Sequence, residues 1–299
     1  MFGVLKAELR KCAGWGVGAW HILNGSRTRA IRAYDRPGTV LSVVSHNPAR
    51  KVFASILDFL VGEGFSFIST DELLDGNLVE MGKERGRLAW LTLDDGWRDT
   101  IENVLPEIER HRIPLTYFIS PGESEMGDLW PHRVAGKVTQ DVRESLWNMC
   151  ADERYDVIVK AVGEVETRLL MDERDIRRLS KHELLTFENH TYSHLSCANR
   201  PADEVKEEIQ RTQAVLEEWT GRTPRLMCYP FGRYTKETDY RIRRETGLVP
   251  VKLAPGVMDE ASICERRNQF YDTMSLTENS CRVFGAWRKI RNYKPVASK

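Results

Sequence analysis

The sequence lacks any cysteine spacing typical of a disulfide-rich or zinc-finger domain, because its six cysteines are scattered and none forms a CxxC pair. A chain of 299 residues with so few cysteines is not a small secreted domain held together by disulfides. We therefore predict a reducing compartment, and the cytoplasm is our expectation for the location of the protein.

The chain also lacks a long apolar run. Its most apolar N-terminal stretch, Ala13 to Leu23, is interrupted by glycines and is shorter than the ~20 residues that a membrane-spanning helix needs. No clear signal peptide follows from this stretch. Trp15 and Trp20 leave open a peripheral contact with the inner face of a membrane, because tryptophan favours the membrane interface.

Net charge of one sign is absent as well, since 44 basic residues balance 44 acidic ones. Charge alone therefore gives no indication of nucleic-acid binding. Basic residues do gather at both ends of the chain, within residues 1–36 and after Glu278. We interpret these ends as solvated, and attraction to anionic lipid or to a phosphate-bearing substrate is the alternative.

From Gly38 onward, short β-rich runs alternate with longer amphipathic stretches. The expected strands are residues 39–45, 65–68, 87–93, 114–120, 184–188, 225–229 and 248–253, and the expected helices are residues 48–61, 99–112, 202–220 and 236–245. This alternation predicts an α/β fold with a parallel sheet closed into a barrel. Residues 121–183 interrupt the rhythm and are interpreted as a helical insertion. We predict one catalytic domain, residues 37–299, after a basic appendage, residues 1–36.

The first polar cluster is Asp94-Asp95-Gly96, directly after an expected strand. Barrel enzymes place their active sites at the carboxyl ends of strands. One of two adjacent carboxylates can bind a metal while its neighbour acts as a base. Gly96 permits a tight turn there. Taken alone, an ordinary turn is the commoner explanation, because Asp and Gly are usual turn residues.

The second cluster is the pair His190 and His194, which holds two of the seven histidines in the chain. We predict a helical turn here, in which residues four apart lie on one face and reach one metal ion. Two histidines and a carboxylate leave positions open for water and substrate. Such a set suits Zn²⁺, and Co²⁺, Ni²⁺, Fe²⁺ or Mn²⁺ are alternatives. Ordinary core or solvated histidines would explain the pair equally well.

The third cluster is Cys228-Tyr-Pro-Phe-Gly232, at the end of another expected strand. A backbone N–H group of this turn can donate to a developing oxyanion. Taken alone, a plain turn is again the simpler explanation.

In combination and in this order, LTLDDG, ENHTYSHL and CYPFG resemble the polysaccharide deacetylase (NodB-homology) family, over roughly residues 38–270. The resemblance implies a deformed (β/α)7 barrel that uses a metal ion to hydrolyse acetyl groups on sugars. It implies Asp94 as the general base and the backbone N–H of Tyr229 as an oxyanion donor. It also implies Asp95, His190 and His194 as the metal ligands.

Two features of the common family pattern are missing. Cys228 stands where an arginine usually pairs with the base, and no histidine follows His194 to act as general acid. A circularly permuted branch of the family, resembling poly-N-acetylglucosamine deacetylases, accounts for both. By that resemblance, His46 at the end of the first strand is the general acid. Arg267 is the expected partner of the base, with Arg266 as the next candidate.

The remaining expectations concern the substrate, an N-acetylated saccharide within a glycan or glycan precursor. We expect Trp97, Pro230 and Gly232 to contact it, because aromatic faces pack on sugar rings and the Pro-Phe-Gly turn adjoins the site. Two alternatives stay open. One is hydrolysis of a non-sugar amide, and the other is a carbohydrate-binding protein that has lost activity.

Overall fold

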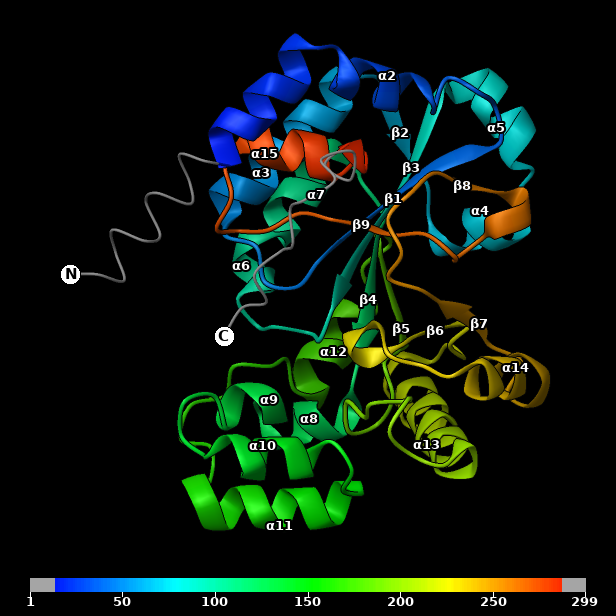
Figure 1. Cartoon of the computed structure of the whole chain (residues 1–299). Helices are drawn as coiled ribbons and strands as arrows, with labels where there is room; N and C mark the ends of the chain where they lie inside the picture. The colour runs from blue at the N-terminus through cyan, green and yellow to red at the C-terminus, as the bar shows by residue number, and fades with distance from the viewer. Residues whose placement is uncertain (1–13, 287–299) are drawn as a thin grey trace.

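The computed structural model describes residues 14–286, and a nine-stranded sheet forms its centre (Figure 1). The strands lie in the order β7-β6-β5-β4-β3-β1-β8, with β2 beside β3 and β9 beside β1. All pairs are parallel except β1 with β8. Their bounds are β1 Thr39–Ser45, β2 Phe65–Phe67, β3 Arg87–Asp94, β4 Leu115–Ile119, β5 Leu185–Asn189, β6 Leu226–Cys228, β7 Val249–Val251, β8 Met258–Asp259 and β9 Asn268–Gln269.

Irregular chain connects the two sides of the curled sheet. Just after β7, the Lys252 N–H group donates to the Cys264 carbonyl at 2.8 Å. The Arg267 N–H group donates to the Ala254 carbonyl at 3.0 Å, immediately before β9 pairs with β1. The predicted parallel, barrel-like α/β fold is therefore confirmed. The side between β7 and β1 consists largely of this irregular chain.

Helices surround the sheet, as Figure 1 shows. A first helical stretch covers residues 14–23. The others are α2 Ser26–Arg32, α3 Arg50–Gly62, α4 Thr70–Asp75, α5 Leu78–Arg85, α6 Thr100–Asn103, α7 Leu105–His111, α8 Pro121–Met126, α9 Trp130–Arg133, α10 Gln140–Leu146, α11 Ala151–Val162, α12 Glu173–Leu179, α13 Ala202–Thr220, α14 Lys236–Glu245 and α15 Leu276–Arg282. Within residues 14–286, no helix is long and apolar enough to cross a membrane.

One expected helix is wrong in detail, because residues 99–112 form two helices, α6 and α7. Pro106 lies in the first turn of α7. Proline has no N–H group and cannot continue the hydrogen-bond ladder of a preceding helix. The chain therefore breaks at Val104 and restarts. By contrast, α13 and α14 begin and end where the amphipathic pattern predicts.

The alternation of side chains along β3 determines which face of the sheet carries Asp94. Leu88 and Trp90 belong to one hydrophobic cluster of the core, and Leu91 and Leu93 belong to another. Successive side chains of a strand point to opposite faces of the sheet. Asp94, the last residue of β3, therefore shares the face of Leu88 and Trp90, and both its oxygens contact the buried Arg267.

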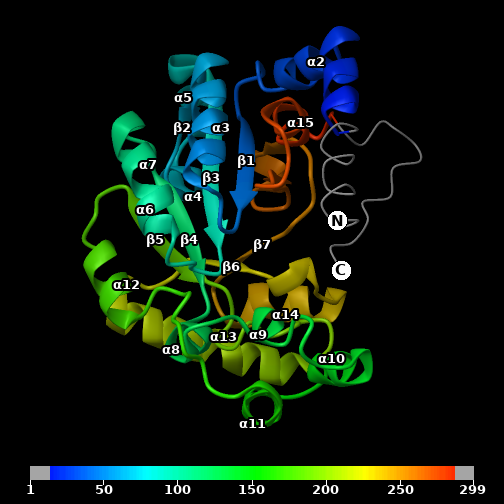
Figure 2. The same cartoon turned by 90° about the vertical axis from the view of Figure 1, so that its left-hand side faces the viewer.

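The insertion between β4 and β5 carries helices α8 to α12. In Figure 2 the arrow of β1 points toward the side on which α8 to α11 and α13 lie. The carboxyl ends of the parallel strands are thus covered by the insertion. That position matches the usual place of substrate-shaping loops in barrel enzymes.

Candidate metal centre and active site

A cavity of about 290 Å³ lies at the carboxyl ends of the strands. Side chains from separate parts of the chain line it, because parallel strands bring their ends to one edge of the sheet. The lining residues are His46, Asp94, Asp95, Leu129, Pro131, His132, His190, His194, Tyr229, Phe231, Gly232, Leu253 and Arg267.

Both carboxylate oxygens of Asp94 accept hydrogen bonds from a buried arginine. Arg267 donates from Nη1 to Oδ1 at 2.7 Å and from Nη2 to Oδ2 at 2.9 Å. Its Nη2 also contacts the Cys228 sulfur at 2.6 Å, the position where the sequence lacks the usual arginine. Burial alone raises the pKa of Asp94, but Arg267, with a further effect of His190, outweighs it and holds the pKa below its ordinary value. The neighbouring Arg266 is exposed and has no such contact.

Asp95 reaches the same cavity because the backbone reverses direction. In an extended strand it would point to the face opposite Asp94. Instead its φ is 78°, and Gly96 follows with a φ of 76°. A Cβ atom on Gly96 would lie 2.6 Å from the Ile119 Cδ1 atom, and the positive φ itself disfavours other residues, so glycine suits this turn. The turn directs both carboxylates of the Asp94-Asp95 pair into one site.

The histidine segment does not form the predicted helical turn. Residues 190–194 are irregular, with positive φ values at Thr191 (61°) and His194 (50°). Polar groups from the side chains and from α13 replace the helical hydrogen bonds. The Leu195 N–H group donates to Thr191 Oγ1 at 2.9 Å, and Glu208 accepts from Ser193 N at 2.8 Å and from Ser193 Oγ at 3.0 Å. This bracing brings both histidines toward Asp95 without a helix.

Asp95, His190 and His194 form a cluster whose ligand atoms all lie within 4.8 Å of one another. The Nε2 atoms of His190 and His194 lie 3.5 Å and 3.2 Å from Asp95 Oδ1. His190 Nδ1 donates to the Cys228 carbonyl at 2.9 Å, which leaves its Nε2 atom for a ligand. His194 Nδ1 is buried without a hydrogen-bond partner. Nitrogen and carboxylate donors in this number fit a divalent metal with open positions.

The electrostatics of this cluster agree with a cation site. Burial raises the pKa of Asp95, but His46, His190 and His194 hold it well below the ordinary value. Burial lowers the pKa of His194 to about 4, so this ring is neutral, as a metal ligand must be. Burial lowers the pKa of His190 too, but contacts with Cys228 and Asp95 raise it overall. A metal ion arriving there displaces a proton.

His46 lies directly after β1 and lines the cavity. Its Nδ1 atom is 3.3 Å from Gln269 Nε2, and Gln269 Oε1 accepts from the Tyr271 hydroxyl at 2.8 Å. Gln269 lies in β9, which pairs with β1 at Val44. The sheet therefore positions the amide that holds one edge of the imidazole.

The Pro-Phe-Gly turn contributes one aromatic face that sequence reasoning did not select. Phe231 adopts a φ of 59°, and its ring centroid lies 4.5 Å from that of His194. The Tyr229 hydroxyl donates to Asp239 at 2.9 Å, so its phenol points into the core. Pro230 is buried and does not line the cavity, whereas Gly232 does. Leu129, Pro131 and Leu253 also line it without a motif that could have indicated them.

Trp97 lies beside the metal cluster, outside the cavity lining. Its Nε1 atom donates to Asp95 Oδ2 at 3.1 Å. Its ring packs edge-on against His132, with centroids 5.5 Å apart. The structure thus gives Trp97 a contact with a candidate metal ligand and does not place it among the residues that line the cavity.

Comparison with known proteins places this geometry in context. The sequence profile described as polysaccharide deacetylase matches residues 81–251. No curated protein sequence matches the chain significantly.

Several solved structures share the fold. The deacetylase PplD of Streptococcus pyogenes, in complex with acetate, has a TM-score of 0.61 and 17% identity, over 83% of this chain and 99% of that chain. IcaB from Ammonifex degensii has a TM-score of 0.56 and 19% identity, over 84% and 97%. BC0361, a polysaccharide deacetylase from Bacillus cereus, has a TM-score of 0.58 and 12% identity, over 83% and 69%.

Proposed function

The chain belongs to the polysaccharide deacetylase family, hydrolases that remove acetyl groups from sugars, and we propose that its barrel cavity performs this reaction on an N-acetylated saccharide with the help of a divalent metal. The observation that carries the proposal is that two adjacent carboxylates have different partners. Asp94 is paired with Arg267, whereas Asp95 faces two histidines. One carboxylate is thus arranged as a base and the other as a ligand.

Asp95, His190 and His194 are the proposed metal ligands, and zinc is the proposed metal. Two imidazoles and one carboxylate, with room for water and substrate, make a typical catalytic zinc set. When bound, such a metal polarises the acetyl carbonyl and lowers the pKa of water. Trp97 supports this assignment, because its hydrogen bond to the second Asp95 oxygen leaves Oδ1 toward the histidines.

The proton transfers are assigned to residues of the chain. Asp94, held ionised by Arg267, accepts a proton from the water that attacks the acetyl carbon. The backbone N–H of Tyr229 donates a hydrogen bond to the developing oxyanion. His46 then donates a proton to the sugar nitrogen as the C–N bond breaks, so that acetate and a free amine leave. Gly232 and Phe231 form the wall nearest to the substrate, and the circularly permuted strand order stays a prediction.

Acetate release tests this proposal. The purified chain is assayed on N-acetylglucosamine oligomers and on nucleotide sugars, before and after chelation and with Asp94→Asn and His46→Ala variants. Activity that is lost on chelation, returns with Zn²⁺ and falls in both variants supports the assigned roles. His182→Ala is the matched control and is expected to keep wild-type activity, because His182 lies outside this cavity and contacts Glu109 through Nε2 at 3.0 Å.

Two other outcomes would replace the proposal. Activity on small amides with none on acetylated sugars would establish the non-sugar amide alternative. Metal binding without any turnover, unchanged by Asp94→Asn, would establish a carbohydrate-binding protein.

We also propose a peripheral contact with an anionic membrane surface. Along residues 14–23, Trp15, Trp20 and Leu23 are 59%, 55% and 86% exposed. At 100° per residue, these three positions fall on one face of the helix. The exposed Arg29 and Arg32 of the adjacent α2 add positive charge. Apolar surface beside arginine is the chemistry of an interfacial helix.

Vesicle flotation tests this contact with phosphatidylglycerol and phosphatidylcholine vesicles. We expect binding to the anionic vesicles, loss of binding in Trp15→Ser with Trp20→Ser, and no loss in Tyr240→Ser, an exposed aromatic on α14. Flotation equal for all three proteins would remove the membrane contact. The basic residues before 14 and after 286 lie outside the described residues, and the inner-face location stays a prediction.

A further inference from the structure

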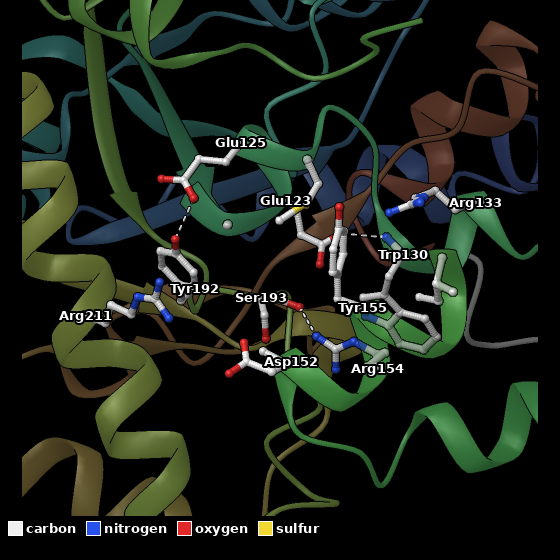
Figure 3. Close-up of a pocket in the computed structure, with 14 residues that line it drawn as sticks. Glu123, Glu125, Trp130, Arg133, Asp152, Arg154, Tyr155, Tyr192, Ser193 and Arg211 are labelled. Carbon is white, nitrogen blue, oxygen red and sulfur yellow. Dashed lines mark hydrogen bonds between the residues drawn. The ribbon is translucent and has the colours of Figure 1, made fainter. Parts of the chain in front are cut away.

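A second cavity, of about 170 Å³, lies between the insertion, the histidine segment and α13, and shares no lining residue with the proposed catalytic cavity. Figure 3 shows its walls, which come from α8, α9, α11, the histidine segment and α13. The lining residues are Gly122, Glu123, Glu125, Met126, Trp130, Arg133, Ala151, Asp152, Arg154, Tyr155, Ile158, Tyr192, Ser193 and Arg211. A cavity of roughly 150 Å³ holds a molecule the size of benzene, so this one holds a group of five or six heavy atoms.

Two buried arginines line this second cavity, and neither forms an ion pair with a described residue. Arg133 is 5% exposed and Arg154 is 2% exposed. Arg133 donates one hydrogen bond, to the Gly163 carbonyl at 2.8 Å, and Arg154 donates one, to the Ser193 carbonyl. Each guanidinium carries five N–H donors. Among residues 14–286, no carboxylate lies within ion-pair distance of either guanidinium.

The acidic side chains that line the cavity are bonded to groups other than Arg133 and Arg154. Glu123 is buried and accepts from the Trp130 N–H group at 2.6 Å. Burial raises its pKa to about 8, against a smaller effect of Arg154, so this carboxyl is mostly protonated at neutral pH. Glu125 accepts from the Tyr192 hydroxyl at 2.6 Å, as Figure 3 shows, and Asp152 is exposed. None of these three carboxyl groups forms an ion pair with Arg133 or Arg154, although Glu123 acts on both arginines from a greater distance.

Aromatic rings pack against the arginines instead of acids. The Arg154 guanidinium lies 5.0 Å from the centroid of the Trp130 ring, and that of Arg133 lies 5.7 Å from Tyr155. Such stacking orients a planar guanidinium and leaves its edge free to donate. Arg211 stacks on Tyr192 at 3.5 Å at the rim. Burial lowers the pKa of Arg154, and Glu123 and Glu208 offset only part of this effect, so a bound anion would further reduce the cost of burying this cation.

We propose that this cavity binds a small oxyanion, a phosphate or carboxylate group, through the free donors of Arg133 and Arg154. Guanidinium forks match the oxygens of these groups in pairs. The same Arg154 holds the Ser193 carbonyl, and Trp130 donates from Nε1 to the His194 carbonyl at 3.1 Å. A bound anion would thus contact the side chains that support the histidine segment. Binding of an anion here does not depend on the proposed function.

Isothermal titration of the full, metal-loaded chain with inorganic phosphate and with acetate, at constant ionic strength in chloride, tests the proposal. We expect binding in the wild type and a loss of at least about tenfold in Arg133→Gln, because hydrogen bonds to charged groups contribute strongly to affinity. Arg174→Gln is the matched control, since Arg174 is exposed on α12 and does not line the cavity. Arg133→Lys, which keeps the charge but not the fork, is expected between the two.

The two anions distinguish the source of the ligand. Tighter binding of acetate identifies a carboxylate such as the product of deacetylation, and tighter binding of phosphate identifies a phosphorylated ligand. Absence of binding by both anions overturns the proposal. Equal affinity in wild type and Arg133→Gln also overturns it, because the anion then binds elsewhere, the metal included. The thermal transition of each variant shows whether it is folded.

Discussion

The two cavities of this molecule differ in whether their buried charged side chains form ion pairs. In the barrel cavity, Asp94 meets Arg267 through two hydrogen bonds and Asp95 faces two histidines. In the insertion cavity, Arg133 and Arg154 form no ion pair with any described residue. A buried ion with its partner in place is preorganised for chemistry, and a buried ion without one is arranged to receive a ligand.

One segment separates the two cavities. The ends of residues 190–194, His190 and His194, line the barrel cavity, whereas Tyr192 and Ser193 line the insertion cavity. Glu208 holds Ser193 from α13, and Arg154 holds it from α11. The insertion therefore helps to hold the segment that carries two of the proposed metal ligands, in addition to covering the carboxyl ends of the strands.

The largest effect is expected from His194→Ala. Loss of one of three ligands is expected to weaken metal binding beyond the ~10–100-fold typical of losing an outer hydrogen bond, and to reduce acetate release to background. Metal content after dialysis and competition with a chromogenic chelator measure the affinity. Tyr192→Phe, on the same segment but facing the other cavity, is expected to retain the metal. Unchanged affinity in His194→Ala would remove the metal centre from the barrel cavity.

The second-largest effect is expected on the free energy of unfolding, when a buried arginine of each cavity is replaced by methionine. Arg267→Met leaves Asp94 buried without its partner, and we expect a loss of about 3–5 kcal/mol in the free energy of unfolding. Arg133→Met removes a buried cation and one hydrogen bond, and we expect a change within about 1 kcal/mol. Denaturant titrations in buffer free of phosphate and carboxylates measure both. Equal losses would mean that Arg133 also has a buried partner, and the contrast between the cavities would fail.

Much of the barrel cavity could be predicted from the sequence, because each strand-end motif is local. Parallel strands must bring their carboxyl ends together, so the sequence alone predicts that the Asp94-Asp95 pair and the two histidines meet at one edge of the sheet. The backbone shape at His190 was not predictable from spacing alone. It depends on Glu208, which lies in α13 and belongs to no recognisable motif.

No motif in the sequence indicated the insertion cavity. Arg133 and Arg154 lie on different helices, and charged residues on helices usually face solvent. Their burial follows from how α9 and α11 pack, through Trp130 and Ile158, and tertiary packing of this kind is not encoded in a short pattern. The pairing of Arg267 with Asp94 is intermediate, because only the family resemblance suggested it.

A smaller effect is expected from pH through Glu123. The pKa of its carboxyl is about 8 in the folded chain, against 4.5 as its ordinary value. Between these two pKa values the folded state holds a proton that the unfolded chain has lost. The free energy of unfolding is therefore highest below the pKa of the unfolded chain and declines as the pH rises toward the pKa of the folded chain. Glu123→Gln cannot ionise and is expected to flatten this decline, by at most about 1.4 kcal/mol per pH unit.

Unfolding free energies of wild type and Glu123→Gln from pH 5 to pH 9 measure this difference. Glu144→Gln, an exposed position on α10, is expected to follow the wild type. Parallel curves for wild type and Glu123→Gln would show that Glu123 is ionised in the folded chain. The insertion cavity would then contain its own counter-charge, and the contrast with the barrel cavity would weaken.

The smallest effect is expected from Trp97→Phe, which separates two roles of one side chain. The indole N–H donates to Asp95 Oδ2, so its loss is expected to weaken metal binding about tenfold, as for other hydrogen bonds to a ligand. Trp219→Phe, a core change on α13, is the matched control and is expected to leave metal affinity unchanged. If Trp97→Phe instead raises KM for the saccharide and leaves metal affinity intact, Trp97 contacts substrate, as the sequence predicts. Because the ring lies against His132 at the edge of the cavity, only measuring both quantities assigns it.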